Sequence, residues 1–224
     1  MGHVRRLIAF DLDGTLIDSR RDLAESANQL IAELKGEPLP EDSIGMMIGE
    51  GAAVLVRRAL AAARLGESGP AALARFLDIY GTRLLNRTRV YDGIPEAVRA
   101  ARRHARVAVL TNKPAQPSDR ILAGLGLRDL FDEVIGGDGP MPRKPDPASL
   151  IALMDRAGAT ASRTLLIGDS AIDHETARRA SVRCCLATYG FGYARFLPDR
   201  LTGDEWIVTD PVALPHVIER FAAD

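Results

Sequence analysis

The hydrophobic and polar positions along the chain change their spacing twice. Near the N-terminus, a short continuous apolar run, Leu7-Ile8-Ala9-Phe10, is typical of a strand buried on both faces of a parallel sheet. From Asp18 to Asn86 the apolar residues recur at helical spacing, and nothing there reads as a strand. From Tyr91 onward, short apolar runs alternate with helical segments. The pattern predicts an α/β protein with a helical segment inserted directly after its first strand.

The inserted segment contains three helical regions. The first follows Ser19, whose spacing to Asp22 resembles a capping box. The second covers residues 52–63, and the third covers residues 70–84, with Pro70 at a favoured first-turn position. We therefore expect a purely helical insert.

The remainder of the chain predicts a sheet. Expected strands cover residues 106–110, 133–135, 164–167, 183–187 and 206–208. Strands that alternate with helices imply a Rossmann-like, doubly wound parallel sheet with right-handed crossovers. The expected organisation is a core domain formed by residues 1–16 and 88–224, and a helical cap domain formed by residues 17–87.

Composition and charge narrow the function classes. The chain has 224 residues, is 46% hydrophobic and carries a formal net charge of −1, which gives no reason to propose a nucleic-acid or membrane partner. Its two cysteines, Cys184 and Cys185, are adjacent, so we interpret them as small core residues rather than a disulfide framework. Without a signal-peptide apolar region or a run of membrane length, the expected location is cytoplasmic.

Candidate chemistry begins where the first strand ends. Asp11 and Asp13 follow the apolar run directly, and Gly14 permits an unusual tight turn. Strand ends in an open α/β sheet face the ligand crevice. Two carboxylates side by side there are costly unless a cation holds them, and hard oxygen ligands suit Mg²⁺. An ordinary Asp-Gly turn explains this short motif equally well, so the other strand ends must decide.

Polar residues follow three other elements. Thr111 ends one expected strand, Lys144 precedes a helix, and Asp169 ends another strand. Taken singly, each has an ordinary interpretation as a capping residue, a surface lysine or a turn residue. Their order along the chain is far more specific than any one of them.

This order resembles the four-motif signature of the haloacid dehalogenase-like (HAD) hydrolases, in its phosphatase form and closest to the phosphoglycolate phosphatases. The resemblance covers nearly the whole chain, cap included. Its departures are His174, where relatives usually carry an aliphatic residue, and Ala180-Ser181, where Ala-Gly is common. The segments that carry it are Phe10–Ser19, 48–51, 57–60, 91–93, 111–114, 143–147, 168–170 and 188–190.

The resemblance implies a role for each motif residue. Asp11 would be the nucleophile that forms an aspartyl-phosphate, and Asp13 the general acid and base. Mg²⁺ would be held by Asp11, the Asp13 backbone carbonyl and Asp169, with Asp173 in the outer sphere. Phosphate oxygens would be bound by Thr111, the Asn112 backbone and Lys144.

The implied substrate is a small phosphorylated metabolite, and hydrolysis of 2-phosphoglycolate to glycolate and phosphate is the expected reaction. We expect the cap to close over the site, with Arg57 or Arg58 as candidates to bind the substrate carboxylate. The alternative, that both arginines are solvated, stays open. So do a monomeric and a homodimeric state.

Alternative activities also remain. A pyrophosphatase or a nucleotide or sugar-phosphate phosphatase of the same superfamily would share these motifs. A phosphomutase keeps both first-motif carboxylates, but Thr111-Asn-Lys-Pro114 favours the hydrolases. A dehalogenase has no need of Asp13, because a halide leaves without protonation. A non-catalytic binding module has no need of it either.

Overall fold

The computed structural model describes residues 5–66 and 69–224. Residues 1–4 of the expected core and 67–68 of the expected cap therefore lie outside the described residues. In the described part, a six-stranded parallel sheet has the order β5-β4-β1-β6-β7-β8. Its strands are β1 (Arg5–Phe10), β4 (Arg106–Leu110), β5 (Glu133–Ile135), β6 (Ala159–Gly168), β7 (Arg183–Ala187) and β8 (Trp206–Val208).

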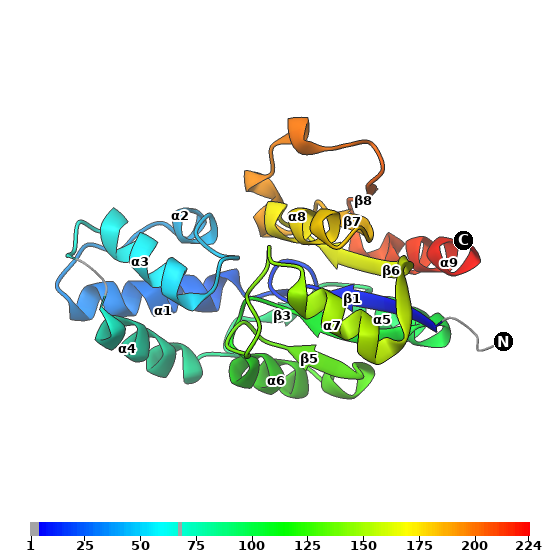
Figure 1. Cartoon of the computed structure of the whole chain (residues 1–224). Helices are drawn as coiled ribbons and strands as arrows, with labels where there is room; N and C mark the ends of the chain where they lie inside the picture. Colours follow the sequence, from blue (N-terminus) through cyan, green and yellow to red (C-terminus); the bar gives the residue numbers. More distant parts are fainter. Residues whose placement is uncertain (1–4, 67–68) are drawn as a thin grey trace.

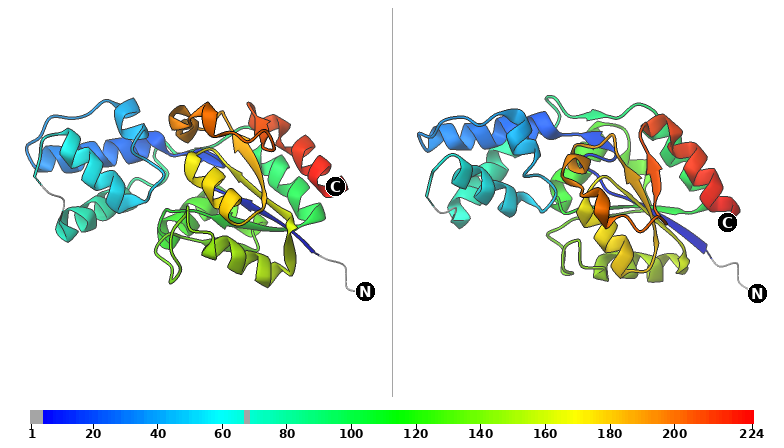
Figure 2. Two further views of the ribbon diagram at one scale, coloured as in Figure 1. Left: turned by 45° about the horizontal axis from the view of Figure 1, so that its top comes forward. Right: turned by 90° about the horizontal axis from the view of Figure 1, so that it is seen from above.

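Helices cover both faces of this sheet (Figures 1 and 2). Ile8 and Phe10 of β1 face a cluster that includes α5 (Ile94–His104) and α9 (Leu214–Ala223). Leu7 and Ala9 face α7 (Ala148–Ala157) and α8 (Ala171–Arg179) on the other side of the sheet. The alternation explains why β1 reads as one continuous apolar run. The remaining helix of the core is α6 (Ala115–Gly124). Short 3-10 turns cover Arg128–Leu130, Phe191–Arg195, Pro198–Arg200 and Pro211–Ala213.

Four further helices gather beyond one end of the sheet (Figure 1). They are α1 (Arg20–Glu33), α2 (Glu41–Gly45), α3 (Ala52–Ala62) and α4 (Pro70–Gly81). The predicted α/β fold with a helical insert after the first strand is confirmed. The sequence did not reveal short α2, nor the two-residue strands β2 (Ile17–Asp18) and β3 (Arg89–Val90), which pair antiparallel where the chain enters and leaves the insert.

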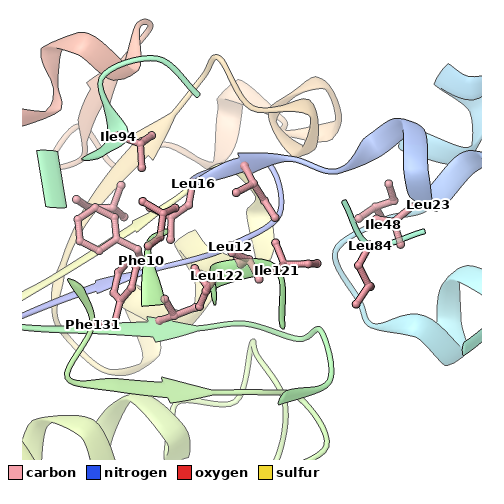
Figure 3. Packing of buried hydrophobic residues seen from close by; sticks show 14 of the residues in the cluster. Phe10, Leu12, Leu16, Leu23, Ile48, Leu84, Ile94, Ile121, Leu122 and Phe131 are labelled. Atoms are coloured by element: carbon pink, nitrogen blue, oxygen red, sulfur yellow. The ribbon is translucent and has the colours of Figure 1, made fainter. Parts of the chain in front are cut away.

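Packing continues from the sheet into the insert. Phe10 and Phe131 meet edge to face, with ring centroids 6.2 Å apart (Figure 3). Leu23, Ile48 and Leu84 belong to the same hydrophobic cluster at its insert end. A shared apolar cluster opposes separation of the two parts, because separation would expose that surface to water.

The capping box expected at Ser19 and Asp22 is wrong. The Ser19 hydroxyl donates to Asp13 Oδ1 rather than to a helix amide. The Asp22 carboxylate is fully buried and accepts from the Arg87 and Thr88 amides and the Thr88 hydroxyl, at 2.8–3.0 Å. Both side chains have tertiary partners, which local spacing does not reveal. Asp22 thereby ties α1 to the segment that leaves the insert.

Both cysteines lie in the core of the protein. Cys184 and Cys185 are free and buried in β7, as expected for core residues. Within residues 5–66 and 69–224, no helix combines the length and the apolar character needed to cross a membrane.

The Asp22 contacts predict a loss of stability. We expect Asp22→Ala to lower the free energy of unfolding by about 3 kcal/mol, because it leaves buried donors without an acceptor. The exposed Asp78→Ala in α4 is the matched control and should stay within about 0.5 kcal/mol of the parent chain. Urea unfolding followed by circular dichroism measures both. Equal stability of the two variants would show that the Asp22 contacts contribute nothing.

Candidate active site

The site is built around the turn that follows β1. The Asp11 amide donates to the Ile167 carbonyl at 2.8 Å, which extends the sheet pairing to the first carboxylate. Gly14 adopts φ +91°, and a Cβ atom there would lie 1.9 Å from Asp169 Oδ2. Only glycine fits this position, since the backbone angle and the approach of Asp169 both exclude a side chain.

A buried lysine joins two of the carboxylates. Lys144 Nζ donates to Asp11 Oδ1 at 2.7 Å and to Asp173 Oδ1 at 2.6 Å. Burial by itself lowers the pKa of Lys144, but the two carboxylates outweigh it and hold that pKa above its ordinary value. The ammonium therefore stays charged, which is what a group that neutralises two buried anions requires.

Asp173 is held in turn by its own helix. At the start of α8, the Ser170 hydroxyl and amide both donate to Asp173, and the Asp173 amide donates back to the hydroxyl. This is a true capping box, and it fixes the carboxylate that orients Lys144.

Asp11, Asp169 and Asp173 form a candidate metal site. Each offers one carboxylate oxygen, and these atoms all lie within 4.8 Å of one another. Burial, then the charges of Asp173 and Asp13, raise the pKa of Asp11 to about 7 despite Lys144. Burial and the charges of Asp11 and Asp173 raise the pKa of Asp169 well above its usual range. A cluster of oxygen ligands with excess negative charge suits a hard divalent cation.

The segment after β4 lines the same site. Thr111 and Asn112 are buried, and the Asn112 side-chain amide donates to the carbonyls of Lys144 at 2.9 Å and of Gly49 at 3.0 Å. Asn112 therefore links the backbone at Lys144 to the insert. All motif residues named from the sequence, namely Asp11, Asp13, Thr111, Asn112, Lys144, Asp169 and Asp173, are brought to this edge of the sheet.

Lys113, within the segment Thr111-Asn-Lys-Pro114, is a residue of the site for which the sequence predicts no role. Its Nζ lies 3.0 and 3.1 Å from the two carboxylate oxygens of Asp13, and the Tyr80 ring lies 4.6 Å from it. Asp13 thus has its own cation and stands apart from the acidic cluster. A lysine directly after a buried strand end, within reach of the Asp-x-Asp turn, was the available sequence signal.

A cavity of about 50 Å³ lies between core and insert. Asp11, Asp13, Lys113 and Asp169 belong to its lining, whereas Arg57 and Arg58 do not. Arg57 is exposed, and Arg58 forms an ion pair with Glu50. The recognition role of these arginines stays a prediction.

His174 also lies away from the cavity lining. It is buried, with Nε2 2.6 Å from Glu205 Oε1 and its ring against Phe196. It is not part of the acidic cluster. These contacts describe a core histidine with a satisfied partner.

Comparisons with known proteins agree on one family. Residues 8–187 match the family described as haloacid dehalogenase-like hydrolase. The chain is 42% identical over 194 residues to a phosphoglycolate phosphatase of Rhodospirillum rubrum, covering 83% of this chain and 80% of that protein. It is 38% identical over 203 residues to one of Pseudomonas putida, covering 87% and 73%. A crystal structure described as a predicted phosphoglycolate phosphatase from Haemophilus somnus superposes with a TM-score of 0.85 at 31% identity, covering 96% of this chain and 99% of the other.

The raised pKa values predict that cation binding depends on pH. A proton on Asp11 competes with the cation, and with a pKa of about 7 that proton is bound at pH 5 and absent at pH 8. Because the pKa of Asp169 is raised as well, we expect Mg²⁺ affinity to rise by at least about tenfold per pH unit from pH 5 to pH 7. Calorimetric titration measures it, with Asp169→Asn as a variant of reduced affinity. An affinity independent of pH over this range would contradict the assignment of Asp11 as a ligand.

Proposed function

The chain belongs to the haloacid dehalogenase-like hydrolase family, and from that premise we propose that it is a Mg²⁺-dependent phosphatase of small phosphate monoesters. The proposed reaction is hydrolysis of 2-phosphoglycolate to glycolate and phosphate, which is supported by relatives of that name at about 40% identity. The observation that carries the proposal is the pair of carboxylates after β1. Asp11 is buried and bound by Lys144, and Asp13 beside it is bound by a different lysine, Lys113.

Asp11 is the proposed nucleophile. Lys144 occupies its Oδ1 atom, and no hydrogen bond within residues 5–66 and 69–224 occupies Oδ2. A carboxylate oxygen attacks phosphorus, the bond from phosphorus to the ester oxygen breaks, and an aspartyl-phosphate forms. Lys144 keeps Asp11 oriented while it shares its charge with the incoming phosphate, which an ammonium does as a point contact.

Asp13 is the proposed acid and base. It donates a proton to the departing alkoxide in the first step and takes one from the attacking water in the second. Its contacts with Ser19 and Lys113 fix the carboxylate in the lining of the cavity. Separation from the acidic cluster leaves it available for proton transfer.

Thr111, the Asn112 backbone and Lys144 are proposed to bind the phosphate oxygens. The groups proposed to hold Mg²⁺ are the Asp11 and Asp169 carboxylates and the Asp13 backbone carbonyl. Asp173, which accepts hydrogen bonds from Lys144 and Ser170, is proposed to lie in the outer sphere. The fit rests on the close-set oxygen atoms of the acidic cluster. When bound, the ion supplies positive charge that offsets repulsion between a carboxylate nucleophile and an anionic phosphate.

We also propose that the insert is a mobile cap. The cavity of about 50 Å³ holds only a few water molecules, so a substrate needs the two parts to separate before it enters. Strands β2 and β3 carry the chain in and out of the insert and are the proposed hinge. Accordingly, residues 1–16 and 88–224 are assigned to the core, and 17–87 to the cap. Closure excludes bulk water from the reacting groups.

The expected partner is a small phosphorylated metabolite. A cytoplasmic location stays a prediction, as does the choice between monomer and homodimer. Pyrophosphate, nucleotides and sugar phosphates are comparison substrates for the assay below.

The role of Asp13 predicts a dependence on the leaving group. Alkoxides need the proton most, so Asp13→Asn should lower kcat/KM for phosphoglycolate and ethyl phosphate by about 100-fold or more, and much less for p-nitrophenyl phosphate. Phosphate release is measured with Mg²⁺ and again with EDTA, which should abolish it. The exposed Asp155→Asn in α7 is the matched control. If the parent chain released no phosphate from any of these esters or the comparison substrates, the phosphatase assignment would fail; equal losses on all esters would remove Asp13 as the acid.

A further inference from the structure

The two walls of the cavity differ in chemistry. The core wall presents Asp11, Asp13, Thr111, Asn112, Lys113 and Asp169. The cap wall presents Leu23, Ile48, Ala52, Leu55, Phe76, Leu77 and Tyr80. Among the described lining residues, Lys113 is the one cation, and the Tyr80 hydroxyl is the only side-chain polar group from the cap.

The proposed chemistry limits where a substrate carboxylate lies. Asp13 must reach the leaving oxygen to protonate it. In phosphoglycolate a single methylene separates that oxygen from the carboxylate carbon. Whatever binds the carboxylate therefore lies within a few ångströms of Asp13. Lys113 Nζ meets this requirement at 3.0 Å from Asp13 Oδ1, whereas Arg57 and Arg58 are outside the lining.

Lys113 has capacity for another anion. An ammonium has three N–H donors, and its hydrogen bonds at 3.0 and 3.1 Å go to a single carboxylate, that of Asp13, while another side of the ammonium faces Tyr80. Lys113 is buried and belongs to the cavity lining, so its ammonium is placed to bind an anion in the cavity.

Tyr80 supplies an unused donor from the cap. Its side chain is 3% exposed, its ring stacks on Phe76, and its hydroxyl, which faces the Lys113 ammonium, donates to no acceptor within residues 5–66 and 69–224. Burial raises the pKa of Tyr80 to about 12 despite Lys113, so the hydroxyl keeps its proton. A buried hydroxyl without a partner is costly, and a ligand that accepts its hydrogen bond removes that cost.

We propose that Lys113 from the core and the Tyr80 hydroxyl from the cap together bind the carboxylate of a short phosphorylated acid. This subsite rests on the proposed phosphatase function and deepens it. Because one group comes from each side of the cavity, the carboxylate is bound fully only in the closed cap. The apolar remainder of the cap wall disfavours substrates with further hydroxyl groups, such as sugar phosphates.

Two stable ligands isolate the carboxylate. 3-Phosphonopropionate matches phosphoglycolate with methylene in place of the ester oxygen, and propylphosphonate replaces its carboxylate with methyl. Calorimetric Kd values for both, measured with Mg²⁺, give a carboxylate preference for each variant. We expect the parent chain to prefer 3-phosphonopropionate by at least tenfold, because a hydrogen bond to a charged group contributes about that factor.

Tyr80→Phe removes only the hydroxyl and keeps the stacked ring. It should reduce the preference about tenfold, mainly by weakening 3-phosphonopropionate. Lys113→Met should abolish the preference, with circular dichroism used to confirm folding. Tyr193→Phe, which loses a hydroxyl outside the cavity lining, is the matched control and should keep the preference. In turnover, Tyr80→Phe should lower the kcat/KM ratio of phosphoglycolate to ethyl phosphate by the same factor, chiefly through KM.

Three outcomes would overturn the subsite. The first is a parent chain without a carboxylate preference, and the second is an unchanged preference in both Tyr80→Phe and folded Lys113→Met. The third is a carboxylate preference that is lost in Arg57→Met or Arg58→Met instead. Each of these is compatible with phosphate release by the parent chain in the ester assay. Failure of the subsite is therefore distinguishable from failure of the proposed phosphatase function.

Discussion

The bridge from Lys144 to Asp11 and Asp173 is the contact on which the site depends. It places one buried ammonium 2.7 Å and 2.6 Å from two buried carboxylates, while Asp169 adds a third negative charge nearby. Carboxylates gathered in a buried site repel one another and favour protonation unless positive charge compensates them. Lys144 supplies part of that charge, but burial and, after it, the charges of the neighbouring carboxylates still raise the pKa of Asp11 and of Asp169. In the proposed function, a divalent cation would offset the remaining negative charge of the carboxylates, and Lys144 would face the substrate phosphate.

Backbone geometry makes this concentration of charge possible. The parallel sheet brings the ends of β1, β4 and β6 to one edge, so residues far apart in sequence meet there. Glycines then let the chain approach Asp169 from several sides: a Cβ at Gly190 would lie 2.3 Å from Asp169 Cβ, and one at Gly192 would lie 2.8 Å from Asp169 Oδ2. The Gly192 amide uses this closeness to donate to Asp169 at 2.7 Å. The position of the Asp169 carboxylate thus depends on the small residues around it as much as on its acidic neighbours.

The sequence predicted the parts of the molecule that local pattern controls. Strand spacing located the sheet, helical spacing located the insert, and motif order identified the residues at the sheet edge. What it could not predict depends on partners distant along the chain. Asp22 looked like a helix cap but receives its hydrogen bonds from residues 87–88. Lys113 lies in the segment 111–114 and Tyr80 in the third predicted helix, and no local pattern shows that the two side chains lie together. Arg57 and Arg58 are candidates because a guanidinium fork fits a carboxylate, and the sequence alone does not show which way either side chain points.

The central claim is that Asp11 attacks phosphorus and carries the phosphoryl group. The direct measurement is to quench the enzyme during steady-state turnover of phosphoglycolate, reduce it with borohydride and map the modified residue by peptide mass spectrometry. An acyl phosphate is reduced to the alcohol, so the account predicts homoserine at position 11 and none at positions 13, 169 or 173, with the signal absent in Asp11→Asn. Homoserine at another of these positions, or full turnover by Asp11→Asn with reversion to aspartate excluded, would contradict it.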